Sequence, residues 1–146
     1  RLYPTKLRLL DLVPAITSLE HDVSTADLMV RFTHENVPPG LPHDLTLALY
    51  RVVQEALKNA ITHSDAREIR VHLEGRAGTL FLSIVDDGVG FDVDAALGEG
   101  LGLISMRERL DPVGGALTIK SIRGAGTRIE IVVANVGAHA RETLAV

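Results

Sequence analysis

Apolar residues recur at helical spacing in three stretches of the chain. The longest runs over residues 42–63, where the apolar positions follow the i, i+3, i+4, i+7 spacing of one helix face. Residues 7–20 show a mostly helical spacing with Pro14 near the expected start. Residues 101–110 form a third such stretch, which an Asp-Pro pair ends. The pattern therefore predicts three helices.

Between these stretches the period changes to two, as expected for strands with one buried face. Residues 69–74 and 80–86 alternate in this way around a turn expected at Gly75–Gly78, which predicts a hairpin. Three further stretches have strand character: 28–33, 117–121 and 127–133. This order of elements predicts an α/β two-layer sandwich, in which helices cover one face of a mixed, mostly antiparallel sheet.

Composition narrows the function classes. The chain has 146 residues, 46% of them hydrophobic and 23% charged, which is typical of a soluble globular domain. A net charge of −4 argues against a nucleic-acid partner. The absence of cysteine excludes disulfides and Cys-zinc sites and fits a cytoplasmic protein. No apolar run is long enough for a membrane span, and the start without methionine suggests a fragment of a larger protein.

The long predicted helix carries a candidate metal-binding edge. Glu55 and Asn59 lie one turn apart, within about 40° of each other around the helix axis, and His63 continues the line. A carboxylate and an amide oxygen so placed can reach one hard cation such as Mg²⁺. The alternative is an ordinary solvated edge of an amphipathic helix, with His63 favoured by the helix dipole.

Three glycine clusters follow the helix. Asp86 ends an apolar strand and leads into Gly88 and Gly90, where a carboxylate suits an exocyclic amino group such as that of adenine. Gly100 and Gly102 precede a predicted helix whose free N–H groups could bind phosphate. A common Asp-Gly hairpin turn, a loop–helix junction and a β-turn at 124–127 remain the alternatives for each cluster alone.

Taken in order, the four motifs resemble the GHKL (Bergerat) ATP-binding fold, and most closely the catalytic domain of bacterial sensor histidine kinases. The resemblance covers about residues 25–133. The similar segments are Glu55-x-x-x-Asn59-Ala-x-x-His63 for the N box, Asp86-x-Gly88-x-Gly90 for the G1 box, Gly98-x-Gly100-Leu-Gly102-Leu for the G2 box and Gly124-x-Gly126-Thr127 for the G3 box.

The resemblance implies a role for each motif in binding Mg-ATP. It makes Glu55 the catalytic residue, which orients a metal-bound water or assists proton removal, and Asn59 the Mg²⁺ ligand. Asp86 holds the adenine amino group, with Thr127 near it through water. The implied ATP-binding residues are Lys58, Asn59, His63, Asp86, Gly88, Val89, Gly90, Gly98, Gly100, Leu101, Gly102, Leu103, Gly126 and Thr127.

The chain departs from the family pattern in two places. Thr62 occupies a position that is often basic in the family, and Lys58 or Arg107 could compensate for the missing phosphate contact. The phosphoacceptor motif is absent, because none of the histidines at 21, 34, 43, 63, 72 and 139 has the expected helical context. The resemblance therefore implies that the acceptor histidine lies on a dimerisation domain outside this chain.

The resemblance also implies partners and boundaries. The short segment between Gly90 and Gly98, and residues 102–109, resemble the short-lid subfamily that works with LuxR-type (NarL-like) response regulators. We expect a monomeric isolated domain, a homodimeric full-length protein and a cytoplasmic location, whether or not other segments anchor the parent protein in a membrane. The predicted division is a dimerisation-region remnant at 1–22, the ATP-binding domain at 23–134 and a loose tail at 135–146.

Two other functions share these motifs. An anti-sigma-type serine kinase keeps the fold and transfers phosphate to a partner protein. A nucleotide-binding pseudo-kinase would bind ATP without transfer. The G2-like sequence argues against the first, and the presence of Glu55, Asn59 and Asp86 argues against the second.

Overall fold

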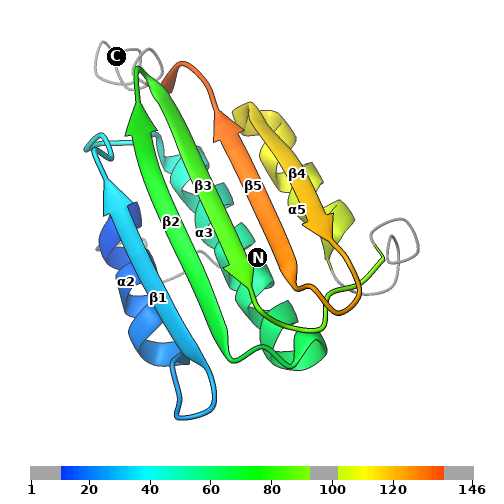
Figure 1. Ribbon diagram of the computed structural model, residues 1–146. Coiled ribbons are helices and arrows are strands. Elements are labelled where there is room, and N and C mark those ends of the chain that lie inside the picture. The colour runs from blue at the N-terminus through cyan, green and yellow to red at the C-terminus, as the bar shows by residue number, and fades with distance from the viewer. Residues whose placement is uncertain (1–10, 93–101, 137–146) are drawn as a thin grey trace.

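The computed structural model describes residues 11–92 and 102–136. Within these ranges the helices are α2 (Leu12–Val23), α3 (His43–Asn59) and α5 (Leu103–Leu110), with a π-helical turn η1 (Ala60–Ser64) after α3 and a 3-10 turn η2 (Asp111–Val113) after α5. The strands are β1 (Met29–Glu35), β2 (Glu68–Arg76), β3 (Thr79–Asp86), β4 (Gly115–Ser121) and β5 (Thr127–Val133). They form a sheet in the order β1-β2-β3-β5-β4 (Figure 1).

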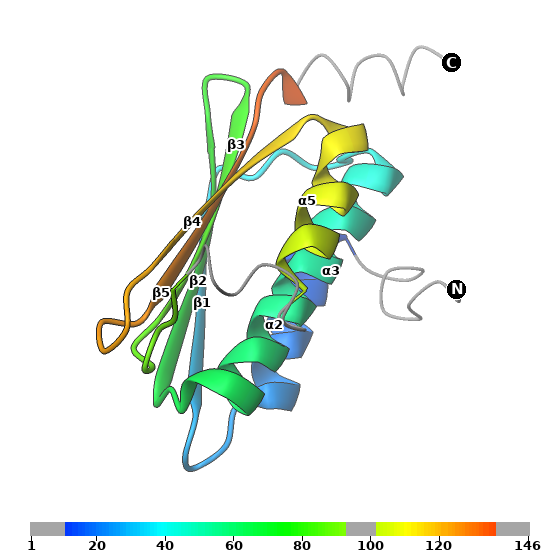
Figure 2. The ribbon, with the colours of Figure 1, turned by 90° about the vertical axis from the view of Figure 1, so that its right-hand side faces the viewer.

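The sheet is mixed, as the sequence predicted. β1 runs parallel to β2, and the other neighbouring pairs are antiparallel. The three described helices lie together on one face of this sheet, so the molecule has two layers (Figure 2). The predicted two-layer α/β architecture is confirmed. No described helix combines the length and the apolar character that crossing a membrane requires.

The core lies between the two layers and is aliphatic. Leu49, Val52 and Val53 of α3 are buried against the sheet, and Ile69 and Leu73 supply the facing side from β2. Each such side chain contributes roughly 1.5–3 kcal/mol by leaving water. The apolar side chains that recur every 3.6 residues in α3 and every second residue in β2 thus face each other and form one core.

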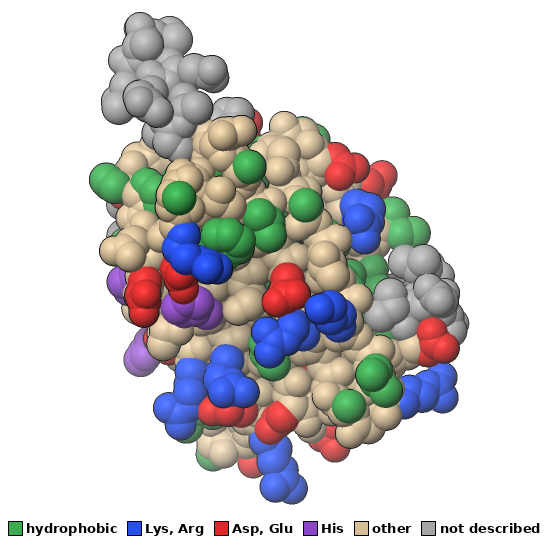
Figure 3. All heavy atoms as spheres, turned by 45° about the horizontal axis from the view of Figure 1, so that its top comes forward, with side chains coloured by type: hydrophobic (Ala, Val, Ile, Leu, Met, Phe, Trp, Pro, Cys, Tyr) green, Lys and Arg blue, Asp and Glu red, His purple; other side chains and the backbone are tan. Residues whose placement is uncertain are grey.

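The opposite face of the sheet is open and charged. Strand residues there form ion pairs, across neighbouring strands in Arg31–Glu68 (2.6 Å) and within β2 in Arg76–Glu74 (2.8 Å). Positive and negative side chains are interspersed on the face seen in Figure 3. Exposed pairs of this kind contribute little to stability, typically about 0–1 kcal/mol each, so the open face is solvated rather than structural.

One turn differs from the sequence-based expectation. The hairpin turn was expected over Gly75–Gly78, but β2 continues to Arg76 and the turn is formed by Ala77 and Gly78, both with positive φ. Gly75 lies in the strand, where a Cβ would collide with the carbonyl oxygen of Asn36. Close approach of a neighbouring chain, and not a turn, is therefore the reason for glycine at position 75.

The described termini also refine the predicted domain boundaries. α2 extends to Val23, and its residues Leu12, Ile16 and Leu19 are buried in the common core, so this part of the 1–22 segment packs as one unit with the sheet. Val136 was assigned to the loose tail, but its side chain is only 1% exposed and its N–H donates to the carbonyl of Gly78 at 2.8 Å. The chain is therefore fixed at least to Val136.

Candidate functional site

A pocket lies at the end of the sheet where β3 and β4 end and β5 begins, beside the carboxyl end of α3. The ends of these strands can be followed in Figure 1. We call this pocket the glycine-loop pocket. Its described lining residues are Ala56, Asn59, His63, Ser64, Ile84, Asp86, Gly90, Phe91, Leu103, Thr127 and Ile129. Apolar side chains form its inner wall, and polar groups stand at its rim, which is the usual composition of a ligand site.

The end of α3 brings three polar residues to this pocket. After Asn59 the helix changes to the π-helical turn η1, which is wider than an α-helical turn and common at functional sites. The change places His63 and Ser64 at the pocket with Asn59, whose Oδ1 atom is buried. Ser64 closes the turn, because its hydroxyl donates to the carbonyl of Ala60 at 2.8 Å.

Asp86 supplies a carboxylate at the end of β3. Its Oδ1 accepts a hydrogen bond from the N–H of Gly88 at 2.9 Å. Burial raises the pKa of Asp86 above its ordinary value of 3.8, and the hydrogen bond from Gly88 partly offsets this rise. An anionic oxygen in a partly desolvated position interacts strongly with a hydrogen-bond donor of a ligand.

The neighbouring carboxylate has a different task. Asp87 is exposed, and its Oδ1 accepts hydrogen bonds from the backbone N–H groups of Arg67 (2.8 Å) and Glu68 (3.0 Å). These bonds hold the pKa of Asp87 below its ordinary value. Asp87 thus fastens the start of β2 to the loop after β3. The sequence analysis predicted a role for Asp86 and none for Asp87.

Glycine is required in this loop because backbones meet there. A Cβ on Gly88 would lie 2.6 Å from Cβ of Ser64, and one on Gly90 would collide with the carbonyl of Ile122. A Cβ on Gly126 would collide with the carbonyl of Asp86. Gly90 and Gly126 also have positive φ, at 67° and 79°. The two loops and η1 are therefore packed into one unit around Asp86.

The start of α5 forms the next side of the site. Gly102 precedes the helix with φ of 71°, and a Cβ there would lie 2.6 Å from Cδ of Glu55. Leu103 is buried and lines the pocket. The first free N–H groups of α5 consequently begin next to the carboxylate of Glu55. Gly98, Gly100 and Leu101 of the predicted phosphate loop lie outside the described residues.

Several residues at the site were not predicted from the sequence: Ala56, Ser64, Ile84, Phe91 and Ile129 of the pocket lining, and Ser121 behind it. Phe91 lines the pocket, and its N–H donates to Oγ of Ser121 at 2.9 Å. The same Oγ lies 2.8 Å from Oγ1 of Thr127, which is buried. Ser121 ends β4 and is 30 residues from Phe91 in the chain. Only strand pairing brings them together, so no local pattern could have found them.

Some predicted residues lie at the margin of the pocket or away from it. Val89 has a half-exposed side chain and contributes its backbone, because its N–H donates to the carbonyl of Ser64 at 2.7 Å. Lys58 is exposed and lines a different groove, between α2 and α3, together with Leu19 and Val23. Arg107 is exposed on α5. The helical spacing that groups Glu55 with Asn59 turns Lys58 away from them.

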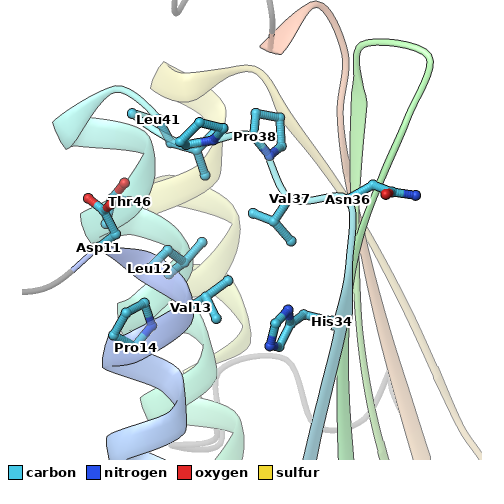
Figure 4. A pocket seen from close by; sticks show the side chains of 12 residues that line it. Asp11, Leu12, Val13, Pro14, His34, Asn36, Val37, Pro38, Leu41 and Thr46 are labelled. Carbon is cyan, nitrogen blue, oxygen red and sulfur yellow. The ribbon is translucent and has the colours of Figure 1, made fainter.

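A second, wider pocket lies at the other end of the same sheet (Figure 4). It is bounded by the start of α2, the loop after β1 and the start of α3. Water can enter about 380 Å³ there, compared with about 60 Å³ in the glycine-loop pocket. The lining includes Pro14, Pro38 and Pro39 and none of the predicted site residues. We call this the far-end pocket. Its larger volume does not make it the functional candidate, because the chemistry of the lining selects the glycine-loop pocket.

The arrangement of the chain is shared with solved structures. The histidine kinase domain of the blue-light activated histidine kinase from Erythrobacter litoralis EL346 superposes with a TM-score of 0.73 at 19% identity, covering 91% of this chain and 64% of that one. The ATP binding domain of PrrB from Mycobacterium tuberculosis gives a TM-score of 0.62 at 21% identity, covering 86% and 95%. These similarities confirm the fold expected from the GHKL resemblance.

The sequence comparisons define the family. Residues 44–136 match the family model described as histidine kinase-, DNA gyrase B- and HSP90-like ATPase. The chain therefore belongs to this family of ATPases, and the expected use of ATP follows. 

Relatives within the family are sensor kinases. The chain is 41% identical over 85 residues to the sensor histidine kinase LiaS of Bacillus subtilis (strain 168), which is 58% of this chain and 24% of LiaS. It is 36% identical over 102 residues to the sensor protein VraS of Staphylococcus aureus (strain COL), which is 70% of this chain and 29% of VraS. The aligned part thus spans less than a third of either relative.

Proposed function

We propose that this chain is the ATP-binding catalytic domain of a two-component sensor histidine kinase, which supplies the γ-phosphate of ATP to a histidine on a dimerisation domain. The observation that carries the proposal is the distribution of polar groups around the glycine-loop pocket. Asp86, Thr127 and Asn59 line the pocket, and Glu55 packs against Gly102 at the start of α5, next to the lining residue Leu103. The base of ATP needs hydrogen-bonding groups such as Asp86 and Thr127, and its phosphate chain with Mg²⁺ needs groups such as Asn59, Glu55 and the N–H groups of α5.

Asp86 and Thr127 suit the adenine base. The carboxylate of Asp86 accepts hydrogen bonds and cannot donate them, so it suits the 6-amino group and opposes the 6-carbonyl of guanine. Ile84 and Ile129 supply apolar walls for a flat ring. Gly90 and Phe91 also line the pocket beside these walls.

Asn59, Glu55 and the start of α5 suit the phosphates and Mg²⁺. Oδ1 of Asn59 and the carboxylate of Glu55 are hard oxygen donors, and few protein ligands suffice for Mg²⁺ that is also held by phosphates and water. When bound, the cation neutralises phosphate charge. The residues before and within the first turn of α5 present N–H groups that can hold phosphate oxygens. His63, at the pocket rim, can donate a further hydrogen bond.

Glu55 is the proposed catalytic residue. It is half-buried, and Gly102 packs directly on its side chain. This contact fixes the carboxylate between α3 and the start of α5, where it can accept a proton from an incoming histidine or orient a water. Phosphoryl transfer depends mainly on position and charge neutralisation, so a fixed carboxylate beside the phosphate site is sufficient for this role.

The proposal includes partners outside the chain. They are the dimerisation and phosphoacceptor domain of the same protein, in a homodimer, and a response regulator of the LuxR type (NarL-like), which the sequence of residues 102–109 supports. The isolated domain would be a monomer, and no nucleic acid is involved. Because ATP is a cytoplasmic metabolite, we place the domain in the cytoplasm.

The test is a transfer reaction in two parts. The 146-residue chain is incubated with ATP labelled in the γ-phosphate, Mg²⁺ and the dimerisation domain of its full-length protein. We expect acid-labile, base-stable label on the dimerisation domain, as for phosphohistidine, and no label with Glu55→Ala despite retained ATP binding. Acid-stable phosphoserine on an added partner protein would instead support the serine kinase, and ATP binding without transfer would support the pseudo-kinase.

A further inference from the structure

The hydroxyl group of Ser121 joins three segments of the pocket wall. It accepts from the N–H of Phe91 at 2.9 Å, donates to the carbonyl of Gly126 at 3.2 Å and lies 2.8 Å from the hydroxyl oxygen of Thr127. These partners belong to the loop after β3, the loop after β4 and the first residue of β5. The side chain of Ser121 is itself half-buried, so water competes little for these bonds.

Counting protons decides the direction of the third bond. A serine hydroxyl has one proton and two lone pairs. The N–H of Phe91 can only donate, so it occupies one lone pair, and the carbonyl of Gly126 can only accept, so it takes the proton. The remaining lone pair of Ser121 must therefore accept from Thr127. The single hydroxyl proton of Thr127 is thereby fixed inside the wall.

The register of the sheet relates this hydrogen bond between Thr127 and Ser121 to the pocket. Ser121 is paired with Thr127, and Thr127 is paired with Asp86, so the three residues form a row across β4, β5 and β3. Paired residues point to the same face of a sheet, and Thr127 lines the pocket together with Asp86. With its proton directed to Ser121, Thr127 presents only oxygen lone pairs to a ligand, as the carboxylate of Asp86 does.

We propose that Ser121 is a positioning residue that sets base specificity: by taking the Thr127 proton, it makes this rim accept hydrogen bonds only. Such a rim takes a ligand with an amino group at the 6-position of a purine and disfavours one with a carbonyl there, whether contact is direct or through a water. The inference rests on the proposed function, because it assumes that the base of ATP occupies this pocket.

The test compares ATP with inosine triphosphate, which differs at the purine 6-position by carrying a carbonyl in place of the amino group. Affinities of the 146-residue chain for both are measured by calorimetry with Mg²⁺. In Ser121→Ala the Thr127 proton is released and can turn toward the ligand. We expect the ratio of ATP to inosine triphosphate affinity to fall about tenfold, partly through tighter binding of inosine triphosphate. Ser121→Thr, which retains the hydroxyl, should keep the parent ratio.

A double-mutant cycle separates this role from a structural one. If Ser121 acts through Thr127, adding Ser121→Ala to Thr127→Val changes the ratio no further. A merely structural serine would weaken both nucleotides equally and leave the ratio of Ser121→Ala at the parent value, which overturns the inference. Equal binding of both nucleotides by the parent also overturns it while the proposed function stands. A parent chain that binds no ATP removes the proposed function itself.

If Ser121→Ala does not fold, the parent and Thr127→Val decide the matter. We then expect a parent preference for ATP that Thr127→Val reduces about tenfold. An unchanged ratio in Thr127→Val would show that the Thr127 oxygen does not read the base, and the inference would fall.

Discussion

Two pairs of glycines with positive φ, one pair at each end of the sheet, serve different purposes. At the far end, Gly40 and Gly78 have positive φ, but an added Cβ would meet nothing within 4 Å. At the glycine-loop pocket, Gly90 and Gly126 have the same kind of backbone and also face carbonyl oxygens at collision distance. The first pair serves to turn the chain, and the second also lets three backbone segments converge around Asp86.

This difference explains why polar groups suited to a ligand gather at the glycine-loop pocket and not at the far-end pocket. Convergence at the glycine-loop pocket brings Asp86, Thr127 and Ser121 into one row and fastens them to η1. At the far-end pocket, Pro14, Pro38 and Pro39 stiffen the lining, and Gly40 bends the chain in open space. A narrow pocket with fixed polar groups is therefore the better ligand site, and the wider one is shaped by loops.

The largest effect is expected from a substitution at the point where the backbone segments meet around Asp86. Gly126→Ala should destabilise the fold by about 3 kcal/mol, since it adds left-handed strain to a backbone collision. Gly124→Ala, two residues earlier with φ of 84° and open space, should cost only about 1 kcal/mol. The far-end Gly78→Ala should resemble Gly124→Ala. Urea unfolding of the three variants measures this, and equal losses would show that convergence does not distinguish the two ends.

Asp86→Asn should lower the affinity for ATP about 100-fold while the fold survives. The amide can still accept from Gly88, but it turns a donor toward the donor of the base. Calorimetry gives the affinity. Asp87→Asn is the matched control and should bind ATP as the parent does, because Asp87 bonds only backbone N–H groups of the β2 start among the described residues. Unchanged ATP affinity in Asp86→Asn would remove the adenine assignment.

Asn59→Ala should reduce the dependence of ATP binding on Mg²⁺. If one charge-assisted contact is lost, the affinity gained on adding Mg²⁺ should fall by about tenfold. Lys58→Ala is the neighbouring control and should leave this gain unchanged, because Lys58 lines the groove between α2 and α3. The measurement is ATP titration with Mg²⁺ and with chelator. A metal effect that is equal in both variants would contradict the role of Asn59.

The smallest expected effect concerns pH and the two adjacent aspartates. The raised pKa of Asp86 means that the folded state holds this proton more firmly than the unfolded chain, so its contribution to stability is lost as pH rises from 3.8 through the raised pKa. Asp87 has a lowered pKa, so its contribution is present above 3.8 and lost as pH falls through the lowered value.

Without nucleotide, Asp86→Asn should therefore gain stability relative to the parent between pH 3.8 and neutrality. Asp87→Asn should be less stable than the parent above pH 3.8, and this difference should shrink as the pH falls below 3.8 through the lowered pKa. Unfolding curves across this range give the sign for each variant. Parallel pH profiles for the two variants would show that burial and backbone hydrogen bonds do not separate the two carboxylates.

Much of the fold followed from periodicity. The 3.6-residue spacing over 42–63 became α3 and η1, and the two-residue alternation became β2 and β3. These patterns are reliable because one continuous face must be buried in each element. The hairpin turn was misplaced for a local reason: Gly75 looks like a turn residue in sequence, and its contact with Asn36 exists only after β1 packs beside β2.

The chain by itself determined the kinds of groups available: a carboxylate at a strand end, an amide and a carboxylate one helical turn apart, and glycines in three loops. Only the tertiary structure decided how they are used. Strand pairing set Ser121 beside Thr127, backbone hydrogen bonds gave Asp87 a structural task, and the packing of α2 on α3 formed the groove that Lys58 lines. Local spacing fixes direction within one element, whereas hydrogen-bond partners from distant segments depend on how the elements pack.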